Sequence, residues 1–205
     1  MKLRLFPQET AGIQALASMA EHVTTGTQTL AELLGAARGD FPSLVESLRQ
    51  HEAASTADFA GLLTGMRTSF INPLPREDLY ALGQLLNETN EKITGAGEAI
   101  ELYGLDRIPA RVSDQLEILS RQAELTVTAM KSLNDLDSLE DYWLEILRLA
   151  KRADHTHRVV IVELLGNHSP TSFIKYRSLS DELAAASQQM RSVATQVGSI
   201  IVKES

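Results

Sequence analysis

Apolar residues recur along most of the chain at intervals of three and four positions, the period of one helix face. This pattern divides into six stretches, at about 7–37, 41–69, 75–103, 110–134, 137–166 and 170–203. Residues that end or begin helices separate them: Gly39 with Asp40, Pro73 with Pro75, Gly104 with Pro109, Asp135 with Asp137 and Ser138, and Ser169 with Pro170. A helix of thirty residues spans roughly 45 Å. The pattern therefore predicts an all-α protein, an elongated bundle of six long helices.

The two halves of the chain follow one plan. Each half contains three predicted helices, and in each the second and third are joined at a proline corner. Each second helix carries polar residues at mid-length on its apolar face, Glu52 in the first half and Asp154 and His157 in the second. The offset is about 100 residues. We therefore expect a single domain over 1–205, built as two tandem three-helix bundles from pseudo-repeats at 1–104 and 105–205.

Composition narrows the classes of function. The chain has no cysteine, which removes disulfides and thiolate metal sites. Its formal net charge of −8 argues against a nucleic-acid partner, because phosphate contacts need basic surfaces. Its apolar runs are shorter than the roughly 18 residues that a membrane helix needs, and the first residues are too few for a signal peptide. The simplest expectation is a cytoplasmic protein.

The corner Phe70-Ile71-Asn72-Pro73-Leu74-Pro75-Arg76-Glu77-Asp78 is the most distinctive stretch. Pro75 fits the first helical turn, and Glu77 and Asp78 place negative charge at the positive end of the helix dipole. The stretch resembles the PhoU-like accessory proteins of Pit-type phosphate transporters, which usually read Phe-Ile-Thr-Pro-x-Asp-Arg-Glu-Asp. Asn72 replaces the threonine and Pro75 the first aspartate. The ending Ile200-Ile201-Val202-Lys203 resembles that family too.

This resemblance implies a six-helix fold whose inner faces carry acidic motifs able to bind metal clusters. Aligned with those motifs, the candidate ligands for a divalent or trivalent metal ion are His51, Glu52, Asn87, Glu88, Glu91 and Asp154. Several acids that the family usually has at these motifs are missing here. A hard cation wants several convergent oxygens, so the depleted set favours a metal-free site over tight binding.

Asp154 and His157 also suggest a second kind of site. They lie three residues apart on one helix face, a spacing that helical di-metal enzymes use as Glu-x-x-His on two helices. The chain contains only one such motif, and the simpler interpretation is an Asp–His hydrogen bond between two helices. The sequence has no Gly-x-Ser-x-Gly, Walker or Gly-x-Gly-x-x-Gly motif. Gly95 and Gly97, inside a predicted helix, indicate close helix packing.

We therefore expect a non-enzymatic, cytoplasmic regulator of inorganic phosphate transport. By resemblance, it acts with a Pit-type transporter and is peripheral to the inner membrane through that partner. Long helices rich in Ala and Leu also favour a homo-oligomer, most simply a dimer. Two alternatives stay open: a metal-dependent helical-bundle enzyme that uses Asp154 and His157, and a plain helical scaffold.

Overall fold

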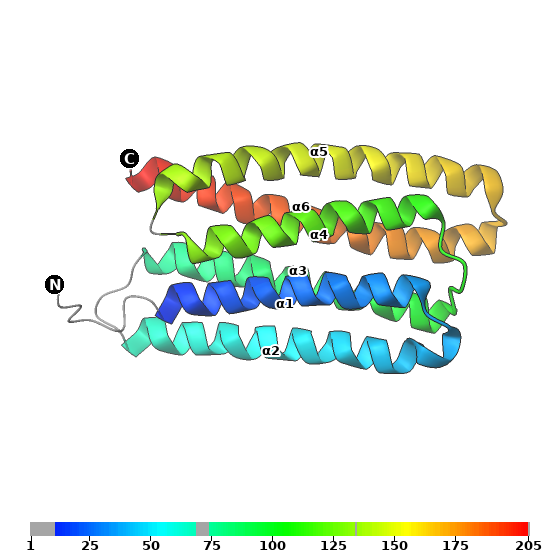
Figure 1. Cartoon of the computed structure of the whole chain (residues 1–205), viewed down its shortest axis with the longest axis horizontal. Coiled ribbons are helices and arrows are strands. Elements are labelled where there is room, and N and C mark those ends of the chain that lie inside the picture. The colour runs from blue at the N-terminus through cyan, green and yellow to red at the C-terminus, as the bar shows by residue number, and fades with distance from the viewer. Residues whose placement is uncertain (1–10, 69–73, 134, 205) are drawn as a thin grey trace.

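The computed structural model describes residues 11–68, 74–133 and 135–204 and is a bundle of long helices (Figure 1). The helices are α1 (Ala11–Gly35), α2 (Phe41–Thr68), α3 (Arg76–Tyr103), α4 (Ala110–Lys131), α5 (Leu136–Asn167) and α6 (Pro170–Glu204), with a short 3-10 turn, η2 (Arg38–Asp40), before α2. The residues that the structure describes contain no strand. The predicted all-α class and its six helices are confirmed.

The helix ends agree with the predicted ones to within a few residues, and the corner residues account for them. Gly104 closes α3 with φ of +61°, a left-handed conformation that favours glycine. The Ser169 hydroxyl accepts the Ser172 N–H at 3.3 Å, which is the predicted cap of α6. Two ends differ: α4 stops at Lys131, and α5 begins at Leu136, ahead of the predicted start. Residues 1–10, 69–73, 134 and 205 lie outside the described residues, and they include positions 70–73 of the Phe70–Asp78 corner.

The six helices form two triads that share one core. Helices α1, α2 and α3 pack on one another, as do α4, α5 and α6, and the triads meet along α3–α6 and α1–α4 (Figure 1). One hydrophobic cluster runs through both triads and includes fully buried leucines from each: Leu16, Leu82, Leu119 and Leu179. The two predicted bundles are thus joined side by side along their length, and their polar residues are brought close to each other between helices.

Glycine permits the close approach of α2 and α3. A Cβ atom added at Gly97 would lie 2.3 Å from Leu48 Cδ1, and one at Gly83 would lie 2.8 Å from the Phe59 ring. Such distances are shorter than any van der Waals contact, so a side chain at either position would displace Leu48 or Phe59 from its packed position. The predicted role of Gly97 in helix packing is confirmed. Gly95 instead faces α6, where an added Cβ would lie 3.4 Å from the Glu182 side chain.

Within 11–68, 74–133 and 135–204, every helix is too short in apolar sequence to cross a bilayer.

Candidate functional site

The candidate residues of α3 are tied into hydrogen bonds along and between helices. Thr56 of α2 donates its hydroxyl to Asn87 Oδ1 at 3.0 Å. The amide of Asn87 donates to Glu91 at 2.8 Å, and Gln84 donates to Glu88 at the same distance. Each of the three predicted α3 ligands therefore has a hydrogen-bond partner within the protein, an amide for Glu88 and Glu91 and a hydroxyl for Asn87.

The candidate residues of α2, His51 and Glu52, lie beside different neighbours. Glu52 lines a shallow hollow between α2 and α3 together with Glu91, Glu98 and Arg49. The guanidinium of Arg49 lies 2.9 Å from Glu98, so a built-in cation already neutralises part of this acidic hollow. The ring of His51 lies near that of His22 on α1, with 6.0 Å between centroids. Burial, and then the positive charge that His22 can carry, lower the pKa of His51.

The buried polar position of α2 is Ser55, not Glu52. Ser55 is fully buried, two turns after Leu48, and its hydroxyl accepts the amide of Asn90 at 3.0 Å. Glu52 is only half-buried at the edge of the same face. A small hydroxyl can enter the core once it is hydrogen-bonded, whereas a carboxylate needs a full set of partners. The prediction that Glu52 interrupts the buried stripe is therefore corrected: Ser55 does.

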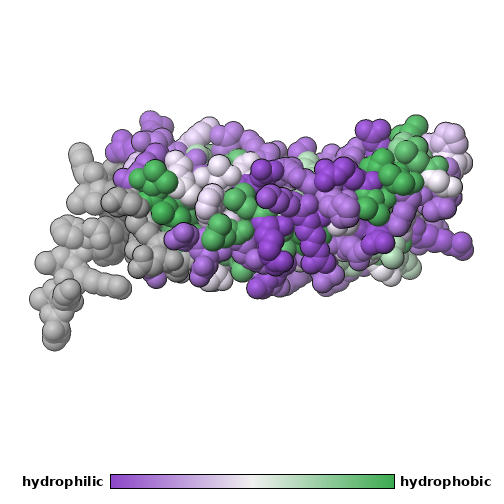
Figure 2. All heavy atoms as spheres, turned by 90° about the horizontal axis from the view of Figure 1, so that it is seen from above, coloured by the Kyte–Doolittle hydropathy of each residue, from purple (hydrophilic) through white to green (hydrophobic). Residues whose placement is uncertain are grey.

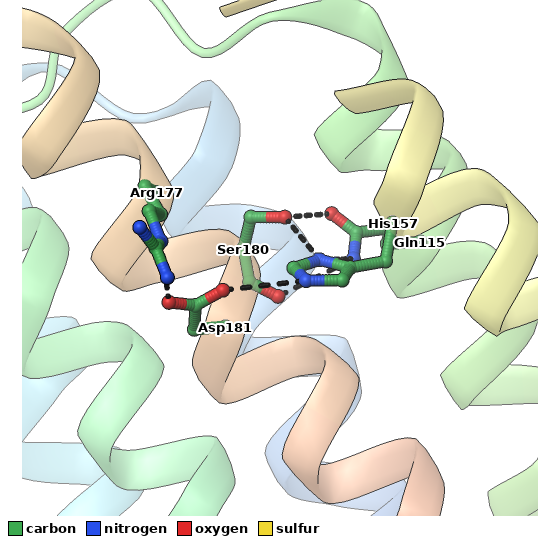
Figure 3. A network of polar contacts seen from close by, with 5 residues as sticks. All are labelled: Gln115, His157, Arg177, Ser180 and Asp181. Atoms are coloured by element: carbon green, nitrogen blue, oxygen red, sulfur yellow. Dashed lines mark hydrogen bonds and ion pairs between the residues drawn. The ribbon is translucent and has the colours of Figure 1, made fainter. Parts of the chain in front are cut away.

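In the second half, Asp154 and His157 have separate partners on α6. Asp154 accepts the amide of Gln188. His157 Nε2 lies 3.3 Å from a carboxylate oxygen of Asp181, and its Nδ1 lies 3.0 Å from the Ser180 hydroxyl (Figure 3). With the proton on Nε2, the ring donates to Asp181 and leaves Nδ1 as an acceptor that faces the Ser180 hydroxyl and the amide of Gln115. The expected Asp–His link between two helices exists, but its aspartate is Asp181.

Two glutamines of α4 extend this network into the core. Gln115 accepts the Ser180 hydroxyl at 2.8 Å, and its amide lies 3.4 Å from His157 Nδ1 (Figure 3). One heptad further on, Gln122 accepts the Ser187 hydroxyl at 2.8 Å. Both glutamines are buried. Sequence reasoning missed both glutamines, and the signal available was the shared seven-residue spacing, 115 with 122 and 180 with 187.

The seven predicted ligands do not converge. His51, Glu52, Asn87, Glu88 and Glu91 belong to the first triad, and Asp154 and His157 to the second. Across the part of the chain that the structure describes, no three His, Asp or Glu side chains are grouped as a metal ion would need. A hard cation requires several convergent oxygens, so this arrangement does not fit a metal cluster, and the predicted ligation stays a prediction.

The polar links between second and third helices recur in both halves. Ser55 pairs with Asn90 between α2 and α3, and Asp154 pairs with Gln188 between α5 and α6. Asp154 lies 99 residues after Ser55, and Gln188 lies 98 residues after Asn90. The two links thus lie at an offset of about 100 residues, and the duplication stays a prediction.

A further buried acid lies where the proline corner meets the end of the chain. Asp78, in the first turn of α3, is 1% exposed. Its Oδ1 accepts from Lys203 Nζ and from Gln196 Nε2, each at 2.7 Å. Its Oδ2 is buried without a hydrogen-bond partner among the described residues. The two stretches on which the family resemblance depends are therefore in direct contact.

Comparisons with known proteins agree with this architecture. No protein-family model matches the chain. The chain is similar to the UPF0111 protein YkaA of Bacillus subtilis (strain 168), with 22% identity over 162 residues, 77% of this chain and 78% of that protein.

Two solved structures share the fold. One is a PhoU-like protein from Shewanella oneidensis MR-1, with a TM-score of 0.73 and 15% identity over 94% of this chain and 99% of that one. The other, from the same organism, is named for a proposed role as a PhoU-like phosphate regulatory protein, with a TM-score of 0.72, 16% identity and the same coverage. The likeness extends over the whole bundle, and the chain has the fold of the PhoU-like proteins.

Proposed function

We propose that this chain is a non-enzymatic regulator of inorganic phosphate transport that acts on a Pit-type transporter from the cytoplasmic side of the membrane. The observation that carries the proposal is the shared fold over 94% of the chain with a protein named for phosphate regulation. The Phe70–Asp78 stretch adds to it, because the family resemblance and the buried Asp78–Lys203 contact coincide there.

The arrangement of polar groups favours a binding body over a reaction centre. A general acid, base or nucleophile must reach substrate in a cleft. Here His157 is held by Asp181, Ser180 and Gln115, and Asp154 is held by Gln188. These contacts bridge helices and leave the two side chains facing different partners. The alternative of an enzyme built on Asp154 and His157 is therefore less well supported than the regulator.

The proposal also covers the domain organisation of the chain and its oligomeric state. The chain acts as one domain over 1–205, built from pseudo-repeats 1–104 and 105–205, and pairs with a second copy. The acidic hollow of Glu52 and Glu91 is the place where a cation could modulate the chain, and there Arg49 already pairs with the neighbouring Glu98.

The test is phosphate uptake by phosphate-limited cells that lack the gene, complemented with the wild-type chain or with an empty vector. We expect uptake to change on deletion and to return on complementation, and the tagged chain to co-purify with a Pit-type transporter. Unchanged uptake would refute the regulatory function. A dinuclear transition-metal content lost on His157→Ala would favour the enzyme, and a stable oligomer with neither metal nor transporter would favour the scaffold.

A further inference from the structure

The outward side of α5 has an unusual surface. Its solvent-exposed positions recur at intervals of three and four, at 144, 148, 151, 155, 158, 162 and 165. Three large apolar side chains lie on this stripe, Leu144, Val162 and Leu165, with 51%, 69% and 62% of their surface exposed. Ile174, just beyond the α5–α6 corner, is 62% exposed. We call these four side chains, with Lys151 and Arg158, the α5 outer face.

The same surface carries positive charge on an acidic protein. Residues 145–181 contain six Lys or Arg and four Asp or Glu, whereas the whole chain has 19 and 27. All four acids are engaged: Glu145 and Asp181 pair with Arg148 and Arg177, Glu163 pairs with Arg111 at 3.0 Å, and Asp154 accepts from Gln188. Lys151 and Arg158 have no hydrogen bond or ion pair within the described residues. Figure 2 views the molecule from the side on which α5 lies in Figure 1, with hydrophilic residues in the middle and hydrophobic patches nearer the two ends.

We propose that the α5 outer face binds an anionic membrane surface directly. Unpaired cations flanked by exposed apolar side chains are the combination that holds a helix at a lipid interface. The apolar groups enter the boundary between headgroups and acyl chains, and the cations contact lipid phosphates. The stripe from Leu144 to Leu165 spans roughly 32 Å at 1.5 Å per residue, so the bundle would lie with α5 along the membrane.

A second copy of the chain is a poorer occupant for this face. An antiparallel two-fold contact that sets Leu144 against Leu165 also sets Lys151 close to Arg158 of the other copy, and like charges there repel. A parallel contact sets each cation against itself. A partner helix from another protein would need an apolar groove, whereas these side chains project singly from the ridge of an outer helix. A bilayer needs no groove, and its phosphates supply the missing negative charge.

The expected affinity for an anionic membrane follows from the number of cations and apolar side chains on the α5 outer face. Each Lys or Arg near an anionic leaflet strengthens binding about fivefold, the equivalent of about 1 kcal/mol. Lys151 and Arg158 together should therefore contribute about 25-fold. Inserting the Leu165 side chain should contribute roughly tenfold. Because the Debye length falls from about 30 Å at 0.01 M to about 10 Å at 0.1 M salt, binding should weaken as salt is added.

The test is co-sedimentation of the full chain with vesicles of phosphatidylcholine alone and with vesicles containing phosphatidylglycerol. We expect binding to the second kind only, weakened about 25-fold in Lys151→Ala/Arg158→Ala and about tenfold in Leu165→Ser. The matched controls are Arg67→Ala/Arg107→Ala, which removes two exposed cations elsewhere, and Leu102→Ser, which removes a leucine that is 78% exposed on α3. Both controls should bind as the wild type does.

Several results would overturn this proposal. They are an absence of binding to anionic vesicles at low salt, equal loss in the control variants, or a dimer in solution that Leu165→Ser dissociates. Circular dichroism of each variant checks that the fold is intact. The vesicles contain no protein, so the outcome is independent of the proposed action on a transporter: either function can fail while the other holds.

Discussion

The contact between Asp78 and Lys203 fixes the end of α6 to the start of α3, and its removal should destabilise the whole bundle. The two residues are 125 positions apart, and the carboxylate is 1% exposed while the lysine side chain is 44% exposed. Lys203→Met keeps most of the aliphatic stem and removes the ammonium. Among the described residues, the buried carboxylate then keeps the amide of Gln196 at 2.7 Å as its side-chain donor, together with the positive end of the α3 dipole.

The expected magnitude lies between two limits. Removing one partner of a fully buried ion pair costs about 3–5 kcal/mol, because a buried charge is left without compensation. Breaking an exposed pair costs about 0–1 kcal/mol. Since Asp78 is buried, Lys203 is partly exposed and Gln196 remains, we expect Lys203→Met to lower the free energy of unfolding by about 2 kcal/mol. For a chain of this size that corresponds to a fall in Tm of roughly 4–8 °C.

Urea unfolding followed by circular dichroism provides the measurement, with the m-value checked for constancy. The matched control is Lys92→Met, which removes another α3–α6 ion pair, with Glu182 at 3.5 Å, in which both side chains are partly exposed. That variant should lose less than about 1 kcal/mol. Adding Asp78→Asn to Lys203→Met should restore part of the lost stability, because it removes the uncompensated charge. If Lys203→Met costs no more than Lys92→Met, the reasoning is refuted.

Three further predictions concern the interior and the pH dependence of stability. Gly97→Ala should lower the free energy of unfolding in urea by about 1–3 kcal/mol, because the methyl group collides with Leu48 of α2. The control Gly61→Ala, where an added Cβ meets open space, should raise that free energy by about 0.5–1 kcal/mol. Equal effects of the two substitutions would contradict the packing argument. Ser180→Ala should cost about 1–3 kcal/mol by leaving the buried Gln115 carbonyl without its donor; a change within error would show that water replaces the hydroxyl. Because burial lowers the pKa of His51 below its ordinary 6.5, its contribution to stability is complete above that pH and is lost as the pH falls through the folded-state value. Tm measured against pH should therefore fall more steeply on the acid side for the wild type than for His51→Gln, and parallel curves would exclude this linkage.

The fold could be predicted because its information is local. Each helix buries one stripe, so the period of apolar residues identifies it without reference to its neighbours. The ends depend on residues whose backbone chemistry stops or starts a helix, such as Gly104 with its positive φ and Ser169 with its capping hydroxyl. The start of α5 was less well predicted, because Asp135, Asp137 and Ser138 all suit a helix N-terminus and the sequence alone does not choose among them.

The polar contacts could not be predicted in the same way, because their partners lie on other helices. Ser55 and Asn90 are 35 residues apart, and Gln115 and Ser180 are 65 apart. A projection at 100° per residue places Ser55 about 20° from Leu48 and Glu52 about 40° from it, so the helix period alone indicates that Ser55 is buried, but it does not identify the partner Asn90. The resemblance identified Asp78 and the Ile200–Lys203 ending separately, and only the structure shows that they touch.

Some polar side chains of this protein face the core and others face solvent, and the two groups differ in whether they have hydrogen-bond partners. Those that face inward, such as Gln115, Ser180 and Gln122, are hydrogen-bonded across helices and fix the register of α4 against α6. Lys151 and Arg158 face outward without a partner in the described chain. A catalyst needs the reverse arrangement, with polar groups held open inside a cleft. A protein that regulates by docking needs a rigid interior and an unsatisfied surface, so variants of the α5 outer face should alter binding while leaving the unfolding free energy unchanged, and variants of the inner network should do the opposite.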